Sequence, residues 1–503
     1  MKKDKSLKIL FLYPNLHMSA LVPYAISILS AVLKKDGFRN IDLFDSTFYE
    51  SFEESKDARG VRLGQVKPFN FKERNVTIKT TNMYEDFSLK VEQMQPDLIA
   101  ASIVEDTYPI FLKFMSTIKD QNIRTVVGGP FPTNAPEIVA LSDSVDFICK
   151  GDGEGAMLDL CNALNQGKEP TKIPNLIIKK NGAITEQNPV REAVGLNKLP
   201  MQDLTIFDPG SFFRPMMGKV YRFAPLEPQR GCPYSCTFCN SPENNTIYKS
   251  DSAGNFLRDR TIKNLHEEID HLVKKFQIEY FFMVSDTFLA MSDKRFDEFC
   301  EMYSNVKLPF FMNTRPETIT EYRAKKLKEI NCHRSNIGVE HGNEKFRAEV
   351  IKRKCSNNAI IRAFQIMHEA GISTALNNII GYPDETRELV FDTIELSRKL
   401  RSNGINAYIF APYKGTRLRN LCEKKGYVDA ETLAHIYTKD SILKMPTLSK
   451  MEIRGLSKTF VFYARLPRAL WKEIEIAESD TAEGQAKHHK LLNLYQSEYL
   501  PTS

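Results

Sequence analysis

Short apolar runs alternate with helix-length amphipathic segments along most of the 503 residues, and they form two separate series. The first series opens with the buried run "KILFLY" at 8–13 and continues with strand candidates at 41–45, 96–102 and 125–129. Strands that alternate with helices in this way are typical of a parallel sheet covered by helices on both faces. The N-terminal part of the chain is therefore predicted to be a doubly wound, Rossmann-like α/β domain.

The second series begins at about residue 222 and contains six strand candidates with helical segments between them. The six candidates are 223–229, 279–285, 308–313, 335–340, 373–380 and 405–411. Successive strand–helix units without a break predict a partial (β/α)6 barrel of the TIM type. In both kinds of fold, ligands bind at the carboxyl ends of the strands, so the loops that follow the strands are the expected positions of functional residues.

These patterns divide the chain into four parts. A hairpin is expected in the second part, where Asn181 and Gly182 form a tight-turn pair. The polar insert 46–90 interrupts the first part, and it is expected to cap a ligand or to contact substrate. The predicted parts are a sheet domain at 1–160, a connector at 161–221, a barrel at 222–424 and a helical region at 425–503.

The composition is that of an ordinary globular protein, with 42% hydrophobic and 26% charged residues. The net charge is +6, but basic and acidic residues are mixed, and no block of like charge marks a nucleic-acid-binding arm. The first apolar run ends at Pro14, too early for a signal peptide, and the run at 20–33 is too short for a membrane span. We expect a cytoplasmic protein that binds no nucleic acid and has no membrane span.

Three of the nine cysteines are clustered, in the stretch "RGCPYSCTFCNSP" at 230–242. Cys232, Cys236 and Cys239 are soft thiolate ligands that suit zinc or an iron–sulfur cluster. A structural zinc site needs a fourth ligand, and no cysteine or histidine lies between 240 and 265. Three thiolates on a four-iron cluster would leave one iron open to bind a substrate or cofactor. Zinc and three unconnected core cysteines remain the alternatives.

The Cys-x3-Cys-x2-Cys spacing, with the aromatic residue Phe238 before the last cysteine, resembles the signature of the radical S-adenosylmethionine (SAM) superfamily. The resemblance implies that the three thiolates hold a [4Fe–4S] cluster whose open iron binds SAM. It also implies that one electron from the cluster cleaves SAM to methionine and a 5′-deoxyadenosyl radical. An electron donor such as flavodoxin or ferredoxin is then expected as a partner.

Further segments in the barrel resemble the SAM-binding motifs of the same superfamily. "FFMVSDTFL" at 281–289 places Ser285 and Asp286 near the SAM amino group, and "NIGVEHGNE" at 336–344 places Glu340 near the ribose or the amino group. His341 stands where a serine is common.

Two more segments complete the expected SAM site. "IKRK" at 351–354 resembles a basic segment that meets the SAM carboxylate, which selects Arg353. "NNIIGYPDET" at 377–386 resembles the motif that flanks adenine, which selects Ile379 and Gly381.

The first domain resembles cobalamin-binding domains, because a Ser-x-Val segment is followed 26 residues later by a diglycine and then by an acidic Gly-rich loop. The implied cobalamin contacts are Ser102, Val104, Gly128, Gly129, Gly151 and Glu154. Many such domains donate a histidine to cobalt from the loop after the first strand. His17 lies in that loop, but the Asp and Gly of the motif are absent, so a polar loop histidine is the other interpretation.

The two domains together resemble the cobalamin-dependent radical SAM enzymes, of the class B methyltransferase type. The resemblance implies methylation of an unactivated carbon of a small-molecule substrate, and the sequence assigns no catalytic side chain. Three alternatives stay open. They are a cyclase or rearrangement enzyme without methyl transfer, a radical SAM enzyme whose first domain binds no cobalamin, and a non-catalytic iron–sulfur or zinc-binding protein.

Overall fold

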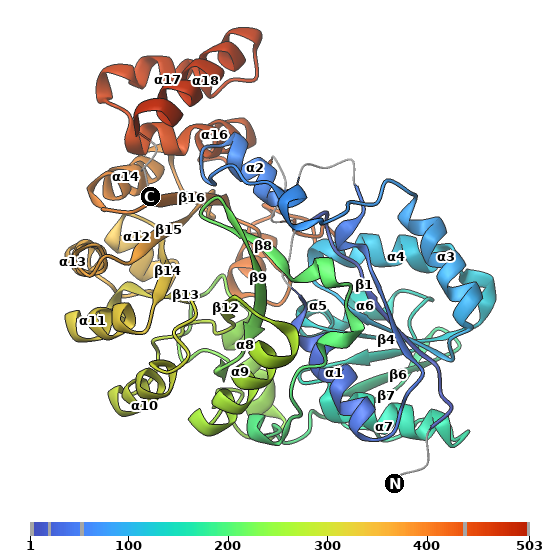
Figure 1. Ribbon diagram of the computed structural model, residues 1–503. Helices are drawn as coiled ribbons and strands as arrows, with labels where there is room; N and C mark the ends of the chain where they lie inside the picture. The colour runs from blue at the N-terminus through green and yellow to red at the C-terminus, as the bar shows by residue number, and fades with distance from the viewer. Residues whose placement is uncertain (1–4, 19–21, 51–54, 436–439, 500–503) are drawn as a thin grey trace.

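The computed structural model describes residues 5–18, 22–50, 55–435 and 440–499, and within them two seven-stranded sheets stand beside each other (Figure 1). The first sheet has the order β2-β1-β3-β4-β5-β6-β7, and its first five strands are parallel. These five strands are β1 (Ile9–Tyr13), β2 (Ile41–Asp45), β3 (Leu98–Ser102), β4 (Arg124–Gly128) and β5 (Phe147–Cys149). The doubly wound sheet predicted from the sequence is therefore confirmed.

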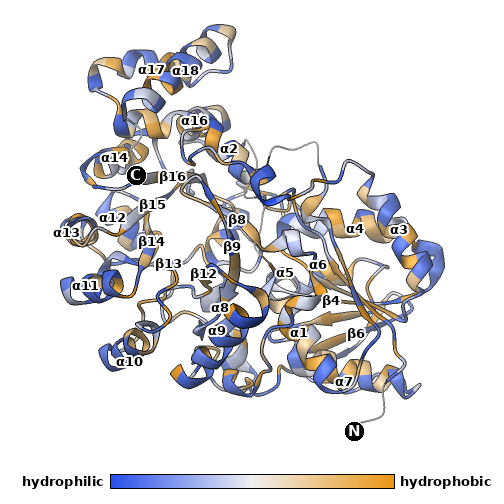
Figure 2. Ribbon diagram, in the orientation of Figure 1, coloured by the Kyte–Doolittle hydropathy of each residue, from blue (hydrophilic) through white to orange (hydrophobic). Residues whose placement is uncertain are grey.

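Helices cover both faces of this sheet, because the apolar side chains of the buried strands point alternately to either side. One face packs against α1 (Tyr24–Lys35) and α7 (Glu154–Asn165), and the other against α3 (Met83–Met94) and α4 (Tyr108–Ser116). The short helices α5 (Pro130–Asn134) and α6 (Pro136–Ala140) follow β4. Figure 2 shows the apolar residues on β4 and β6 and the hydrophilic ones on the outer faces of the helices.

The hairpin expected in the connector is part of the first sheet. It consists of β6 (Leu176–Lys180) and β7 (Ala183–Gln187), and β6 pairs with β5 in antiparallel orientation. The predicted boundary at residue 160 falls inside α7, so the sheet domain continues into the segment expected to be a connector. The pairing buries the apolar face of β6, which a free hairpin would expose.

The second sheet is a curled partial barrel with the order β16-β15-β14-β13-β12-β9-β8. Its six parallel strands are β9 (Lys219–Leu226), β12 (Tyr280–Met283), β13 (Phe310–Thr314), β14 (Cys332–Glu340), β15 (Ser373–Ile380) and β16 (Gly404–Ile409). The short strand β8 (Phe213–Met216) adds to β9 in antiparallel orientation. The predicted barrel fold is confirmed, with this extra strand at one edge.

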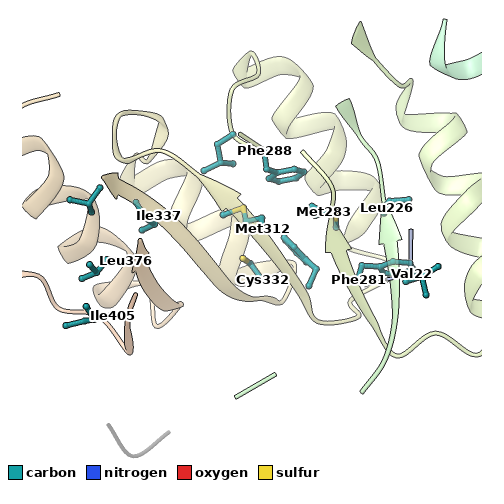
Figure 3. Close-up of a cluster of buried hydrophobic side chains, with 14 of the residues drawn as sticks. Val22, Leu226, Phe281, Met283, Phe288, Met312, Cys332, Ile337, Leu376 and Ile405 are labelled. Atoms are coloured by element: carbon teal, nitrogen blue, oxygen red, sulfur yellow. The ribbon is translucent and has the colours of Figure 1, made fainter. Parts of the chain in front are cut away.

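Helices line the outside of the barrel (Figure 1). They are α9 (Ile262–Phe276), α10 (Asp293–Tyr303), α11 (Glu321–Glu329), α12 (Glu344–Glu349), α13 (Asn357–Glu369), α14 (Arg387–Lys399) and α15 (Arg417–Lys424). The apolar core lies between these helices and the strands, where Phe281, Met283, Met312 and Ile337 are fully buried (Figure 3). Because side chains alternate along a strand, the neighbours of these residues point into the barrel.

The part of the insert described at 55–90 lies against the open side of the barrel. Its helix α2 (Lys56–Arg62) forms a small cavity with Asn406 and Tyr408 of β16, and Arg74 pairs with Glu279 beside β12 at 3.0 Å. A closed barrel would pair its edge strands, but here β8 and β16 are separate edges of the sheet. The insert therefore supplies the wall between them, beside α16 (Figure 1).

The C-terminal region is helical, as expected, with α16 (Lys450–Arg465), α17 (Trp471–Ala477) and α18 (Ala482–Leu494). Helix α16 packs against β16 and α14. Tyr495, which follows α18 in the chain, contacts Gly64 of the insert. None of the helices in the described ranges is long and apolar enough to cross a membrane.

His488 of α18 gives this region a predicted pH dependence. Burial beside Phe462 lowers the pKa of His488 to about 4, and Lys458 adds to the effect. The unfolded chain binds the proton near pH 6.5, so stability is complete above that pH and falls as the pH drops toward 4. For a half-buried side chain we expect a loss of about 1–2 kcal/mol.

Chemical unfolding of the His488→Phe variant between pH 4 and 7 tests this prediction. The variant should lose that part of the pH dependence, whereas His489→Gln, at an exposed neighbouring position, should keep it. Equal pH profiles for the wild type and His488→Phe would contradict the prediction.

Candidate functional site

The three clustered cysteines lie in the loop after β9 and line a cavity of about 780 Å³ at the carboxyl ends of the barrel strands. The loop is held by the short strand pair of β10 (Gln229–Arg230) and β11 (Arg258–Asp259) and by α8 (Ser241–Ser250). Gly231 has a φ of +93°, and a Cβ there would lie 3.1 Å from the backbone of Leu257. Glycine therefore lets the chain turn tightly into the cysteine loop.

The cysteine thiols are free and partly screened from water. Burial raises the pKa of Cys232, Cys236 and Cys239, the last of them to about 12. Arg315 opposes this effect at Cys236, because its Nη1 donates to the sulfur at 3.5 Å. The thiols do not converge on one ion: among the described residues, no group of three His, Cys, Asp or Glu side chains could hold a single metal.

The residues expected to contact SAM line the same cavity, with one exception. Phe238, Ser285, Asp286, Glu340, Arg353 and Ile379 lie on its wall. Gly381 does not. Its N–H donates to the side chain of Glu385 at 2.5 Å, and its φ is +84°. A side chain at this position would point at Ile453 of α16. Gly381 thus allows the turn after β15 and the close packing of α16. The motif alone does not show whether its glycine is needed for such a turn or for contact with a ligand.

Two carboxylates of this cavity accept hydrogen bonds from neighbouring side chains. Arg353 donates to Glu340 at 2.8 Å, and Ser241 donates to Asp286 at 2.8 Å. Burial raises the pKa of both carboxyls, although Arg353 opposes this at Glu340.

Four buried polar atoms on the wall have no hydrogen-bond partner among the described residues: Gln229 Oε1, Asn244 Oδ1, Ser285 Oγ and Arg353 Nη2. The last two belong to the expected SAM contacts. A ligand with amino and carboxylate groups would satisfy them, so the donor set fits SAM.

A second cavity of about 290 Å³ opens at the carboxyl ends of the first sheet. Five of the six expected cobalamin contacts line it: Ser102, Gly128, Gly129, Gly151 and Glu154. Val104 lies outside it, 40% exposed, where it begins a short 3-10 turn. His17 also lies outside this cavity, and its Nδ1 is hydrogen-bonded to the carbonyl of Tyr49 at 2.8 Å.

The glycines of the second cavity allow close backbone approach. Gly129 has a φ of +114°, and a Cβ there would lie 2.5 Å from the carbonyl oxygen of Ile103. Glu154 contributes a buried Oε2 without a hydrogen-bond partner in the described chain. Asn244 Oδ1, on the same wall, is a second buried acceptor without a partner in the described chain. Glycine backbone and unsatisfied acceptors suit a ligand that carries amide donors, as a corrinoid does.

The two cavities adjoin. They share five wall residues: Pro130, Glu227, Arg230, Asn244 and Phe256. Ligands bound in the two cavities would therefore be neighbours.

A buried ion network joins the two domains at this junction. Arg230, two residues before Cys232, contacts Asp152 at 2.9 Å, Glu154 at 2.8 Å and Glu227 at 2.9 Å. Arg258 adds a second contact to Asp152 at 2.7 Å. The three carboxylate side chains are only 8% exposed.

The charges of the network shift the pKa values of its carboxyl groups. Burial raises the pKa of Asp152, but Arg230 and Arg258 outweigh this and lower it below its usual value. Burial raises the pKa of Glu227 in spite of Arg230. Sequence reasoning missed the network, because its two halves lie 78 residues apart.

A second polar contact joins the domains on the other side of the junction. Glu105, after β3, accepts hydrogen bonds from the backbone of Lys414 at 2.8 Å and Ala434 at 2.7 Å. Tyr413, on the wall of the cysteine cavity, donates to Asp106 at 2.8 Å. The loop after β3 is thus tied to the barrel as well as to its own sheet.

Comparisons with known proteins match a separate family to each of the two sheets. The sequence matches the B12 binding domain over residues 19–160 and the Radical SAM superfamily over residues 226–397. The uncharacterized methyltransferase PH0819 of Pyrococcus horikoshii is 25% identical over 398 residues, which are 78% of this chain and 83% of that protein. The anaerobic magnesium-protoporphyrin IX monomethyl ester cyclase of Rubrivivax gelatinosus is 23% identical over 434 residues, or 81% of this chain and 68% of that protein.

Two solved structures share the whole fold. The radical SAM methyltransferase TsrM of Kitasatospora setae, with cobalamin and a [4Fe–4S] cluster bound, has a TM-score of 0.65 at 14% identity and covers 98% of this chain and 99% of its own. OxsB, with aqua-cobalamin and SAM bound, has a TM-score of 0.63 at 15% identity and covers 97% of this chain and 71% of its own. At these identities the likeness concerns the fold.

A B12-binding domain joined to a radical SAM barrel defines the class of protein: the chain is a cobalamin-dependent radical SAM enzyme. Its cofactors are accordingly a [4Fe–4S] cluster, SAM and a cobalamin.

Proposed function

We propose that this enzyme transfers a methyl group derived from SAM to an unactivated carbon of a small molecule. The observation that carries the proposal is the junction of the two cavities, one lined by the three cysteines and the other by the glycines of the first sheet. Methyl transfer of this kind needs the two cofactors to face one substrate, and adjoining cavities permit that. The relative PH0819, named as a methyltransferase, supports the same reaction.

The three thiols hold the cluster in this proposal, and the remaining wall residues orient SAM. When bound, these cofactors supply a one-electron cleavage of SAM to a 5′-deoxyadenosyl radical and a methyl group carried on cobalt. Asp286 and Glu340 accept hydrogen bonds from the SAM amino group, and Arg353 donates to its carboxylate. Phe238 and Ile379 exclude water around the adenine.

The buried ion network holds the two halves of the site in register. Asp152 and Glu154 belong to the loop that forms the second cavity, and Arg230 leads into the cysteine loop. Because a buried pair fixes both partners in one geometry, the distance between the two cofactor cavities is set by these contacts. An electron donor such as flavodoxin or ferredoxin completes the proposal.

A cyclisation without methyl transfer is the second candidate. It is favoured by the similarity to the Rubrivivax gelatinosus cyclase, which extends over 81% of this chain. A cyclase would use the same two cavities but would transfer no methyl group from SAM to the substrate, and it would therefore form no S-adenosylhomocysteine.

Anaerobic reconstitution with iron, sulfide and cobalamin, followed by SAM, a reductant and a small-molecule extract, tests both candidates. We expect 5′-deoxyadenosine together with S-adenosylhomocysteine and a product heavier than its precursor by one CH2 group. Formation of 5′-deoxyadenosine without S-adenosylhomocysteine would favour the cyclase. Protein that retains iron and cobalamin but does not cleave SAM would overturn the proposed chemistry.

A further inference from the structure

The interior of the barrel below the cysteines is polar. Asn313, Asn336 and Asn377, on three neighbouring strands, line the lower part of the cavity together with Phe282 and Tyr408. These side chains alternate with the apolar ones that face the helices, so they point into the barrel. None of them is needed to hold the cluster or SAM in the function proposed above.

The amide groups of this row are largely unpartnered. Asn377 accepts one hydrogen bond from Asn406 at 2.8 Å. The side chains of Asn313 and Asn336 make no hydrogen bond to any residue that the structure describes. Their donors and acceptors therefore face the cavity, where water or a polar ligand must satisfy them.

Arg334 lies two residues before Asn336 on β14 and on the same face of the strand. Its guanidinium reaches across β15, so that Nη2 lies 2.9 Å from the place where a Cβ of residue 404 would be. Gly404 of β16 thus leaves room for the charged group. Arg334 is not among the residues that line the cavity, but it lies on the inward face of β14, two residues from Asn336, which does line it.

Arg334 has no counter-ion in the described part of the chain. The ionisable groups that act on it are the hydroxyls of Tyr280 and Tyr408, and burial lowers the pKa of its guanidinium. By contrast, buried Arg260 pairs with Glu268, and buried Arg347 donates to several carbonyls. Arg334 is half-buried, and a charge that is partly removed from water without a counter-ion is less stable than a paired one, so an anion bound beside it would compensate the charge.

A second unsatisfied group lies beside Arg334. Ser373 is its register partner on β15, and the Ser373 Oγ is buried without a hydrogen-bond partner among the described residues. Tyr408 connects this end of the barrel to the main cavity, because it lines that cavity and also acts on Arg334. The guanidinium of Arg334 and the hydroxyl of Ser373 therefore lie on neighbouring strands, on the same inward face as the asparagine side chains.

We propose that the barrel interior binds a small substrate by an anionic group, a carboxylate or a phosphate, which Arg334 and Ser373 hold while Asn313, Asn336 and Asn377 bind its polar body. The proposal rests on the proposed function for what happens to the bound molecule. With its anionic end at the bottom of the barrel, the substrate presents its other end to the cysteine side of the cavity.

Binding of matched aromatic probes to the reconstituted holoenzyme with SAM tests the proposal. The probes are benzoate, phenyl phosphate and benzamide, compared by calorimetric titration. We expect one of the anions to bind about tenfold or more tightly than the neutral amide, because a hydrogen bond to a charged group contributes a binding free energy of that size. The tighter of the two anions identifies the group as carboxylate or phosphate.

Variants assign this preference to the predicted residues. Arg334→Gln should abolish the anion preference, and Gly404→Ala, which crowds the guanidinium, should weaken it. Arg362→Gln, on the exposed face of α13, should leave it unchanged. An anion preference that survives in Arg334→Gln, or its absence in the wild type, overturns the proposal.

SAM cleavage separates this proposal from the function on which it rests. Arg334→Gln should form 5′-deoxyadenosine without substrate at the wild-type rate, because the residue lies away from the cysteines. A wild type that binds the anion through Arg334 but does not cleave SAM would refute the proposed function and leave the anion subsite standing. A variant that loses both would show that Arg334 has a structural role instead.

Discussion

Replacing Cys236 by alanine is expected to remove reductive SAM cleavage and most of the bound iron. Three thiols are available for the cluster, and the loss of one leaves an iron corner without a protein ligand. Changes to residues that only support a metal ligand already cost 10–100-fold, so the loss of a ligand itself should lower 5′-deoxyadenosine formation by more than about 100-fold. Iron and sulfide content and the rate of 5′-deoxyadenosine formation measure the effect.

Cys355→Ala is the matched control for this experiment. Cys355 is a free, half-buried thiol that does not line the cysteine cavity. The hydrogen bond from Arg347 goes to the backbone carbonyl of Cys355 and not to its sulfur, so alanine would keep it. The control should keep wild-type iron and activity. Equal iron content in the two variants, or one zinc per chain in the wild type, would refute the cluster assignment.

Replacing Arg230 by methionine is expected to lower the free energy of unfolding by about 3–5 kcal/mol, because it leaves buried carboxylates without a partner. Asp152, Glu154 and Glu227 all contact this one guanidinium, and within the described residues only Asp152 also pairs with a second arginine. The variant should also bind cobalamin and retain the cluster less well, since the network connects both cavities. Chemical denaturation and the absorption of bound cobalamin measure the two effects.

An exposed ion pair supplies the comparison for Arg230. Arg362 pairs with Glu321 at the surface, where the two side chains are 47% and 71% exposed. Arg362→Gln should change the unfolding free energy by less than about 1 kcal/mol. If Arg230→Met were as stable as Arg362→Gln and kept both cofactors, the network would not be what ties the domains together.

The local parts of the site were predictable from the sequence because they depend on short segments. The cysteine spacing and the strand-end positions of Ser285 and Glu340 placed these residues on one cavity wall, since the carboxyl ends of parallel strands meet at one edge. The diglycine after β4 was found in the same way. Gly381 and Val104 lie outside the two cavities, because a motif fixes a residue's position on a loop but not the direction in which it faces.

The sequence by itself determined the strand–helix alternation, the two sheets and the clustered thiols, because each follows from side-chain periodicity or spacing within a few residues. Only the tertiary structure decided the contacts between distant segments. These are the hairpin beside β5, the insert along the open side of the barrel, the Arg230 network and the approach of Arg334 to Gly404. Whether a charge is paired or alone depends on which strands the fold brings together, and no local pattern of residues encodes that.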